Sequence, residues 1–144
     1  RDVGNDKTYL MAPQEVVDEV VAHYKSTEAL LRIADLEEYR TALPRYYSGK
    51  MLREQIEQAP SFLKYEIRME GMDRSYEVKD FAADGMECTI GVRQSGGKVH
   101  LKDRTTGETV EAFSNTLTIV RMRYDLDDRR WKGAELIEIV ELDQ

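Results

Sequence analysis

Cysteine is almost absent from this sequence, since Cys88 is the only one in 144 residues. A disulfide framework within the chain is therefore excluded. Histidine is also scarce, with only His23 and His100, and one thiol with two distant imidazoles does not supply the ligands of a zinc site. No run of about eighteen apolar residues occurs, so the sequence predicts no transmembrane helix. We expect neither a metal nor a cofactor.

Basic residues are outnumbered: 21 Lys and Arg stand against 28 Asp and Glu, which gives a net charge of −7. An acidic chain repels phosphate backbones at long range, so we expect no nucleic-acid partner. The length suits one domain, and 41% hydrophobic with 34% charged residues is typical of a soluble globular protein.

The recognisable catalytic motifs are missing too. Ser48-Gly49-Lys50 is not a phosphate-binding loop, because the earlier glycine is absent and Met51 stands where a Ser or Thr should hold magnesium. The acidic run that begins at Asp125 lacks the glycine and glutamate of a calcium loop. Cys88 falls on the apolar side of an alternating segment and is interpreted as a small buried hydrophobe. These missing motifs favour a non-catalytic role and leave an enzyme as the alternative.

The clearest signal in the sequence is a change in the spacing of its apolar residues. Residues 1–12 are polar and are interpreted as an arm or linker, followed by one domain over 13–144. Apolar residues at helical spacing predict a first helix over 13–34. Asp35 has the capping pattern that opens a second helix, to about residue 43. A third helix is predicted over 49–58, ended by Pro60.

After Pro60 the apolar residues recur at every second position, which predicts strands. Strands are expected near 65–70, 76–79, 86–93 and 99–101, with a hairpin turn at 94–97, one long strand over 110–124, a turn at 125–130 and a last strand over 131–142. The predicted fold class is α+β: three N-terminal helices packed on a strongly bent, cone-like antiparallel sheet of four to six strands.

This order of elements resembles the nuclear-transport-factor-2-like superfamily. The resemblance covers about 13–142 and rests on the long first helix, on Asp35 opening the second, and on the stretches LPRYYSGKML at 43–52 and YDLDDRRWKGAELIEI at 124–139. The chain looks nearest to non-catalytic members, bacterial or organelle-associated, among them scaffold domains of plastid division and mitochondrial import. The resemblance implies a cleft between helices and sheet, which members use for isomerase or dehydratase chemistry or leave filled.

The cleft therefore separates two hypotheses. The first is a non-catalytic interaction or assembly domain within a larger protein or complex, with the cleft plugged by Met51, Phe62, Met69 and Met86. The alternative is a small-molecule binding protein or isomerase/dehydratase, with an open cleft lined by His23, Tyr24 and Tyr47. Fold alone does not choose between them.

A partner surface is predicted on the sheet. The segment 110–124 is apolar in both alternation classes, and a strand that is apolar on both sides is covered on both sides. The helices cover one side, which leaves the other for a protein partner or a homodimer. The candidate residues are Arg93, Leu117, Ile119, Val120, Arg121, Met122 and Arg123. The start at Arg1 and the polar arm suggest an upstream tether, so we expect an extracytoplasmic bacterial domain.

Overall fold

The computed structural model describes residues 9–10, 12–112 and 115–142. Within them the fold is α+β, as predicted, with three α-helices before a series of antiparallel strands. The helices are α1 (Gln14–Lys25), α2 (Leu36–Ala42) and α3 (Gly49–Phe62), with 3-10 turns η1 (Ser26–Arg32) and η2 (Leu43–Arg45). The strands are β1 (Tyr9–Leu10), β2 (Tyr65–Glu70), β3 (Asp73–Lys79), β4 (Phe81–Ala82), β5 (Glu87–Ser95), β6 (Lys98–Asp103), β7 (Thr109–Ala112), β8 (Thr116–Asp125) and β9 (Arg130–Glu141).

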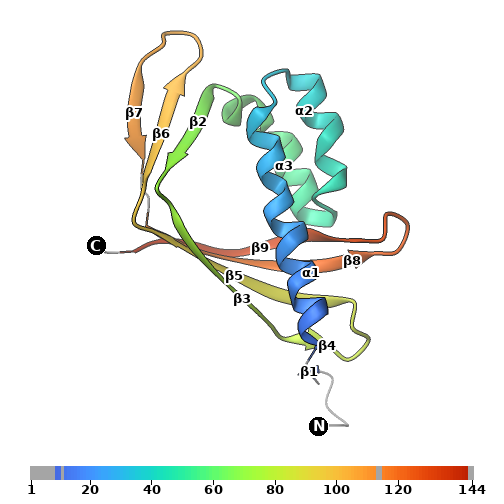
Figure 1. Ribbon diagram of the computed structural model, residues 1–144. Coiled ribbons are helices and arrows are strands. Elements are labelled where there is room, and N and C mark those ends of the chain that lie inside the picture. Colours follow the sequence, from blue (N-terminus) through green and yellow to red (C-terminus); the bar gives the residue numbers. More distant parts are fainter. Residues whose placement is uncertain (1–8, 11, 113–114, 143–144) are drawn as a thin grey trace.

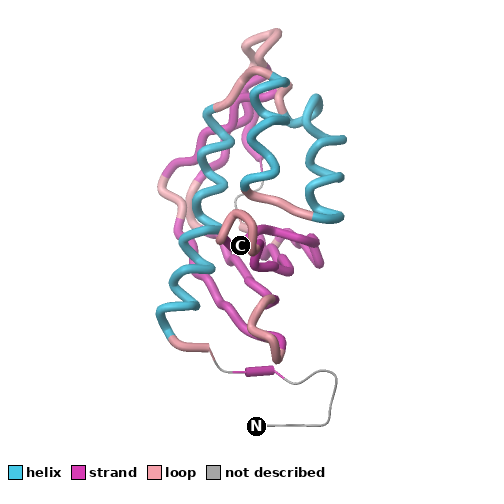
Figure 2. The backbone as a smooth tube through the Cα atoms, turned by 90° about the vertical axis from the view of Figure 1, so that its right-hand side faces the viewer, coloured by secondary structure: helices cyan, strands magenta, loops and turns pink. Residues whose placement is uncertain are grey.

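The strands form a four-stranded sheet in the order β3-β5-β8-β9, a three-stranded sheet in the order β2-β6-β7, and the short pair β1-β4. Figure 1 shows the helices standing on the four-stranded sheet, with β2, β6 and β7 rising beside them. Figure 2, turned by 90°, shows the first helix running alongside the strands over much of the length of the molecule. The cone-like curl of a single sheet stays a prediction.

The segment 94–97, predicted as a hairpin turn, is instead an interruption within a longer pairing. β3 pairs with β5 and β2 pairs with β6 in one continuous register, with Asp73 opposite Ser95 and Glu70 opposite Lys98. A Cβ on Gly97 would lie 2.2 Å from the carbonyl oxygen of Glu70. Two glycines therefore let the backbones meet where both strands pass from one sheet to the other.

Two further boundaries differ from the prediction. The long strand over 110–124 is two strands, because β7 pairs with β6 whereas β8 pairs with β5 and β9. Helix α3 runs through Pro60 to Phe62, since a proline in the last turn removes only one helical hydrogen bond.

The first helix is also shorter than predicted. It gives way to 3-10 geometry at Ser26, where the hydroxyls of Ser26 and Thr27 donate to the carbonyls of His23 and Tyr24. Such side-chain bonds compete with the helical ladder. The start of α2 is as predicted: the Asp35 carboxylate accepts the Glu38 N–H at 2.9 Å.

Two hydrophobic clusters hold the layers together. The larger joins α1 and α3 to the sheet through a buried set that consists of Val20, Met51, Phe81, Cys88, Ile90, Val92, Val120, Met122 and Trp131. The smaller lies among the helices around Leu30, Tyr39, Leu43 and Ala59. Burying each large apolar side chain contributes about 1.5–3 kcal/mol, so the larger cluster stabilises the packing of the helices on the sheet.

Candidate functional site

A cleft of about 420 Å³ lies between the helices and the sheets. One wall is the end of α1 with η1, the second is α3, and the floor is formed by strands. Its lining residues are Tyr24, Lys25, Thr27, Glu28, Leu30, Leu31, Tyr39, Tyr47, Met51, Gln55, Gln58, Phe62, Met69, Arg74, Tyr76, Val92, Gln94, Thr118, Leu136 and Ile139. The cleft opens to solvent, because Glu28, Gln58 and Ile139 are exposed.

The expected plug is absent from this part of the structure. Met51, Phe62 and Met69 line the cleft without filling it, and Met86 does not line it. Met86 precedes β5, where its backbone carbonyl accepts the Tyr124 N–H. An open cleft of this size is within the range of ligand pockets and matches what the binding alternative requires.

Four tyrosines surround the cleft. Tyr24 meets Tyr76 edge-to-face at 6.4 Å between ring centroids, and Tyr39 stacks on Phe62 at 5.4 Å. Burial raises the pKa of Tyr39 to about 12 and raises the pKa of Tyr47 well above its usual range. These hydroxyls therefore remain protonated at neutral pH and act as hydrogen-bond donors, not as general bases.

The charged groups that line the cleft, Lys25, Glu28 and Arg74, each have a partner within it. The Arg74 guanidinium contacts a Glu28 carboxylate oxygen at 2.5 Å and donates to the Gln94 side-chain oxygen at 2.9 Å. Lys25 lies over the ring of Tyr76, 5.8 Å from its centroid. Glu28, the one carboxylate among the residues that line the cleft, is thus held in an ion pair with Arg74.

His23, predicted to line the cleft, lies outside it. Its Nδ1 accepts the backbone N–H of Trp131 at 2.9 Å, at the start of β9. Burial, together with Arg130, lowers the pKa of His23, so the imidazole stays neutral and able to accept. On a helix, adjacent residues point about 100° apart, so His23 meets β9 while Tyr24 enters the cleft.

The predicted partner surface is divided by the sheet. Val120 and Met122 are each 1% exposed and belong to the core, so their place in the surface prediction is wrong. The register pairs Leu117 with Arg93 and Ile119 with Gly91, and these residues line a shallow hollow of about 250 Å³ on the outer face. The strand is apolar on both sides, as the sequence indicated, but the side that carries Val120 and Met122 packs into the core.

Two basic side chains on the outer face, Arg121 and Arg123, are paired with glutamates. Arg121 lies 3.8 Å from Glu87 and 3.6 Å from Glu135, and Arg123 lies 2.6 Å from Glu87. Exposed pairs of this kind contribute little to stability. They do reduce the positive charge that the outer face offers to an anionic partner.

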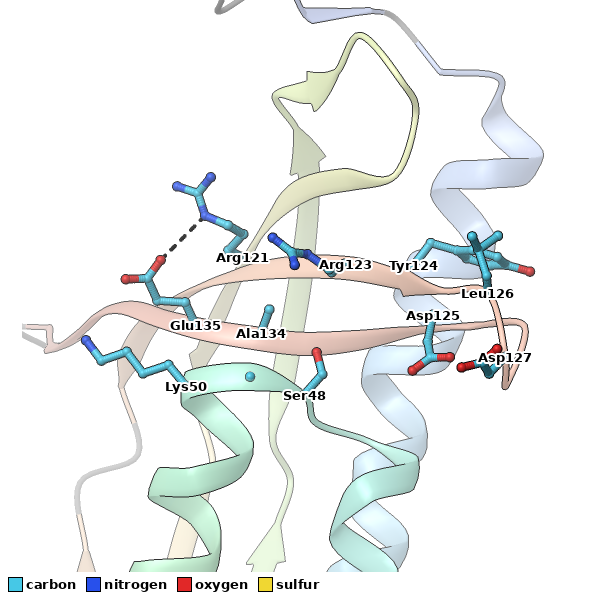
Figure 3. A pocket seen from close by; sticks show the side chains of 11 residues that line it. Ser48, Lys50, Arg121, Arg123, Tyr124, Asp125, Leu126, Asp127, Ala134 and Glu135 are labelled. Atoms are coloured by element: carbon cyan, nitrogen blue, oxygen red, sulfur yellow. Dashed lines mark ion pairs between the residues drawn. The ribbon is translucent and has the colours of Figure 1, made fainter.

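A wider hollow of about 540 Å³ was missed by the sequence reasoning (Figure 3). It lies where the start of α3, at Ser48 and Lys50, meets the β8–β9 hairpin at Asp125 and Glu135. Side chains of both signs line it, so it favours no single charge. The helix start at Ser48 was recognisable, but its position beside a hairpin about eighty residues later depends on long-range pairing that local patterns do not show.

No metal site is formed by the part of the chain that the structure describes, since no group of three or more His, Cys, Asp or Glu side chains comes together there. Among the same residues, no helix is long and apolar enough to cross a membrane.

Comparison with known proteins shows similarity in fold alone. No protein family and no curated protein matches the sequence. Among solved structures, the intermembrane space region of chloroplast protein ARC6 superposes with a TM-score of 0.59, over 94% of this chain and 100% of that one, at 15% sequence identity. The arrangement of helices and strands is thus shared with a region of a chloroplast protein, although the two sequences have little in common.

Proposed function

We propose that this chain is a non-catalytic interaction domain of a larger protein or complex, and that it binds a protein partner whose apolar side chains enter the cleft. The observation that carries the proposal is the chemistry of the cleft. It is open and largely apolar, its ionic groups Glu28 and Arg74 are paired with each other, and its tyrosines remain protonated. Such a site can bind and orient a ligand, but it offers no unpaired acid–base couple.

The rim supports a partner larger than a metabolite. Leu136 and Ile139 both line the cleft and are 39% and 61% exposed, so the apolar wall continues onto the surface. Small-molecule sites usually enclose most of their ligand, whereas an apolar surface that extends beyond a pocket is typical of protein contacts.

The fold comparison is compatible with this proposal. The ARC6 structure is itself one region of a chloroplast protein, and we propose that the present chain is likewise a region of a larger protein. We further propose that the fold belongs to the nuclear-transport-factor-2-like superfamily, which the order of helices and strands supports.

A second contact is proposed on the outer face of the four-stranded sheet, around Leu117 and Ile119, either with a partner or with a second copy. Both side chains are partly exposed beside Arg93. Sedimentation at micromolar concentration tests the homodimer, which Ile119→Glu should dissociate. If the wild-type chain is monomeric, the proposal that this face forms a homodimer is wrong.

Small-molecule binding is a second candidate, favoured by the volume of the open cleft. The experiment that separates the two uses one cleft-filling variant and one control on the same helix. Gln55 lines the cleft from α3, whereas Ser61 is exposed and does not line it. Gln55→Trp should fill the cleft, and Ser61→Trp adds the same ring elsewhere without changing the charge.

Peptides of about ten residues, selected from a random displayed library on the wild-type domain, are titrated against both variants. The proposal expects Gln55→Trp to weaken binding about tenfold or more, as for loss of an interface centre, and Ser61→Trp to bind like the wild type. If no peptide binds and one class of metabolite raises the melting temperature through a Gln55-sensitive site, the small-molecule function is correct instead.

A further inference from the structure

Strand β9 lies at the edge of the four-stranded sheet, and most of that edge is unpaired in the described part of the chain. Only its beginning is used by the domain itself: Gly133 donates to the Tyr46 carbonyl and accepts the Ser48 N–H, both at 2.9 Å. Beyond this bridge, residues 135–141 pair with β8 on one side alone. Free backbone groups therefore lie along this edge, and the bridge at Gly133 shows the kind of pairing that they can form.

The direction of the unpaired groups follows from the register. The Leu142 N–H donates to the Asn115 carbonyl at 2.8 Å, and Glu141 and Ile139 stand opposite Thr116 and Thr118. In an antiparallel pair, residues that bond to the neighbouring strand alternate with residues whose N–H and C=O point away. Ile139 and Glu141 therefore direct their N–H groups toward the open side.

The edge lacks most of the protection that natural sheets give to such strands. Exposed edges usually carry lysine or proline, or are interrupted by bulges. From Gly133 to Leu142 there is no Lys, Arg or Pro, and Leu136, Ile137, Ile139 and Val140 are 39%, 46%, 61% and 36% exposed. The register shifts against β8 fall between Gly133 and Glu135 and between Leu136 and Glu138, so the stretch that remains a regular strand begins at Glu138.

The same edge borders the cleft and the wider hollow at the start of α3. Leu136 and Ile139 line the cleft opposite Gln55 and Phe62 of α3. On the other face, Ala134 and Glu135 border the hollow at the start of α3 (Figure 3). A strand added here would direct alternate side chains into the cleft and toward the outer face, because side chains alternate across a strand.

The negative charge along β9 indicates which kind of strand could pair with it. Three glutamates, Glu135, Glu138 and Glu141, lie along the edge. Of these three, Glu135 alone has an ion-pair partner among the described residues, namely Arg121. Like charges that meet across strands are destabilising. A second copy pairing through β9 would double the negative charge along this edge, whereas a basic strand would neutralise it.

We propose that the free half of β9 binds an extended segment of a protein partner by strand addition. The segment alternates apolar side chains, which enter the cleft beside Ile139, with basic ones, which face Glu138 on the outer side. This inference rests on the proposed interaction function and specifies how the partner is held: backbone hydrogen bonds supply the pairing, and the cleft supplies selectivity for alternate side chains.

The test compares Ile139→Pro with Ile139→Val, using peptides selected on the wild-type domain from the random displayed library. Proline removes the outward N–H, whereas valine retains it together with a β-branched apolar side chain. We expect the selected peptides to alternate apolar and basic residues, to bind Ile139→Val like the wild type, and to bind Ile139→Pro about tenfold more weakly. The amides of Ile139 and Glu141 should exchange quickly in the free domain and become protected in the complex.

The outcomes separate this inference from the function on which it rests. If Gln55→Trp weakens binding but Ile139→Pro does not, the cleft binds its partner without strand addition and the inference is wrong. If neither variant matters, or if no peptide is selected, the proposed function fails as well. Loss of a dimer in Ile139→Pro would overturn the basic partner in favour of self-pairing. Should the proline variant not fold, peptides N-methylated at single positions remove the same bonds from the partner's side.

Discussion

Gly97→Ala should destabilise the domain strongly, because the backbone of another strand occupies the place of its side chain. A Cβ there would lie 2.2 Å from the Glu70 oxygen, 2.8 Å from the Gly71 carbonyl carbon and 2.8 Å from the Met72 nitrogen. All three are main-chain atoms, so no side chain can rotate away. Relief requires a shift of about 1 Å between the two strand crossings, and overpacking of this kind costs about 1–3 kcal/mol or more.

The shift would also loosen the flanking pairs Glu70–Lys98 and Asp73–Ser95, and each hydrogen bond lost there costs about 1 kcal/mol. We therefore expect a total near 3 kcal/mol. With an unfolding entropy of about 2.1 cal/mol/K per residue over 144 residues, the melting temperature should fall by about 10 °C.

Thermal unfolding followed by circular dichroism measures this shift, with Gly91→Ala as the matched control. Gly91 lies in β5, where a Cβ would meet nothing closer than 4.0 Å, at the Glu77 oxygen, so its melting temperature should stay within a few degrees of the wild type. If Gly97→Ala is as stable as Gly91→Ala, the two strands do not meet at this crossing and the sheet arrangement derived from it is wrong.

Three further predictions concern side chains outside the cleft. The pKa of His23 is lowered in the folded chain, so its contribution to stability is present above its unfolded value of about 6.5 and is lost as the pH falls through the lowered pKa; chemical denaturation across pH 7 to 5 should show this loss, and His23→Gln should reduce it. Burial raises the pKa of Cys88 to about 12, so the thiol should react with a disulfide reagent only after unfolding, and rapid reaction of the native protein would contradict its burial. Lys132 is buried and contacts Asp125 at 3.2 Å and Asp128 at 2.5 Å, so Lys132→Met should cost about 1–3 kcal/mol in urea unfolding, whereas an unchanged midpoint would show that both ion pairs are energetically neutral.

Local patterns predicted the elements better than their partners. The change of period at Pro60 and the cap at Asp35 are properties of short segments, and the α+β class with helices first follows from them. The error at 94–97 has a physical cause: two glycines favour a turn in isolation, but here they allow the close approach of two strands. Only the pairing of 70 with 98 distinguishes the two cases.

The site shows the same division. Tyr24 and Tyr47 line the cleft, and the helical stripe that contains Tyr24 could be recognised from spacing. His23 has the neighbouring position but faces β9, and its bond to Trp131 spans more than a hundred residues of sequence. The free edge of β9 could not be predicted, because a strand of alternating apolar residues has the same sequence pattern at the centre of a sheet as at its edge.

The central claim, that the cleft binds a protein segment, is tested most directly by mapping a selected peptide onto the domain through amide chemical shifts in ¹⁵N-labelled protein. We expect the largest changes at Tyr24, Tyr47, Thr118 and Ile139 around the cleft, and little change at Ser75 and Thr89 on the outer face. Changes confined to Ser75, Thr89 and Ile119, with the cleft residues unaffected, would show that the partner binds the other side of the sheet and would contradict the claim.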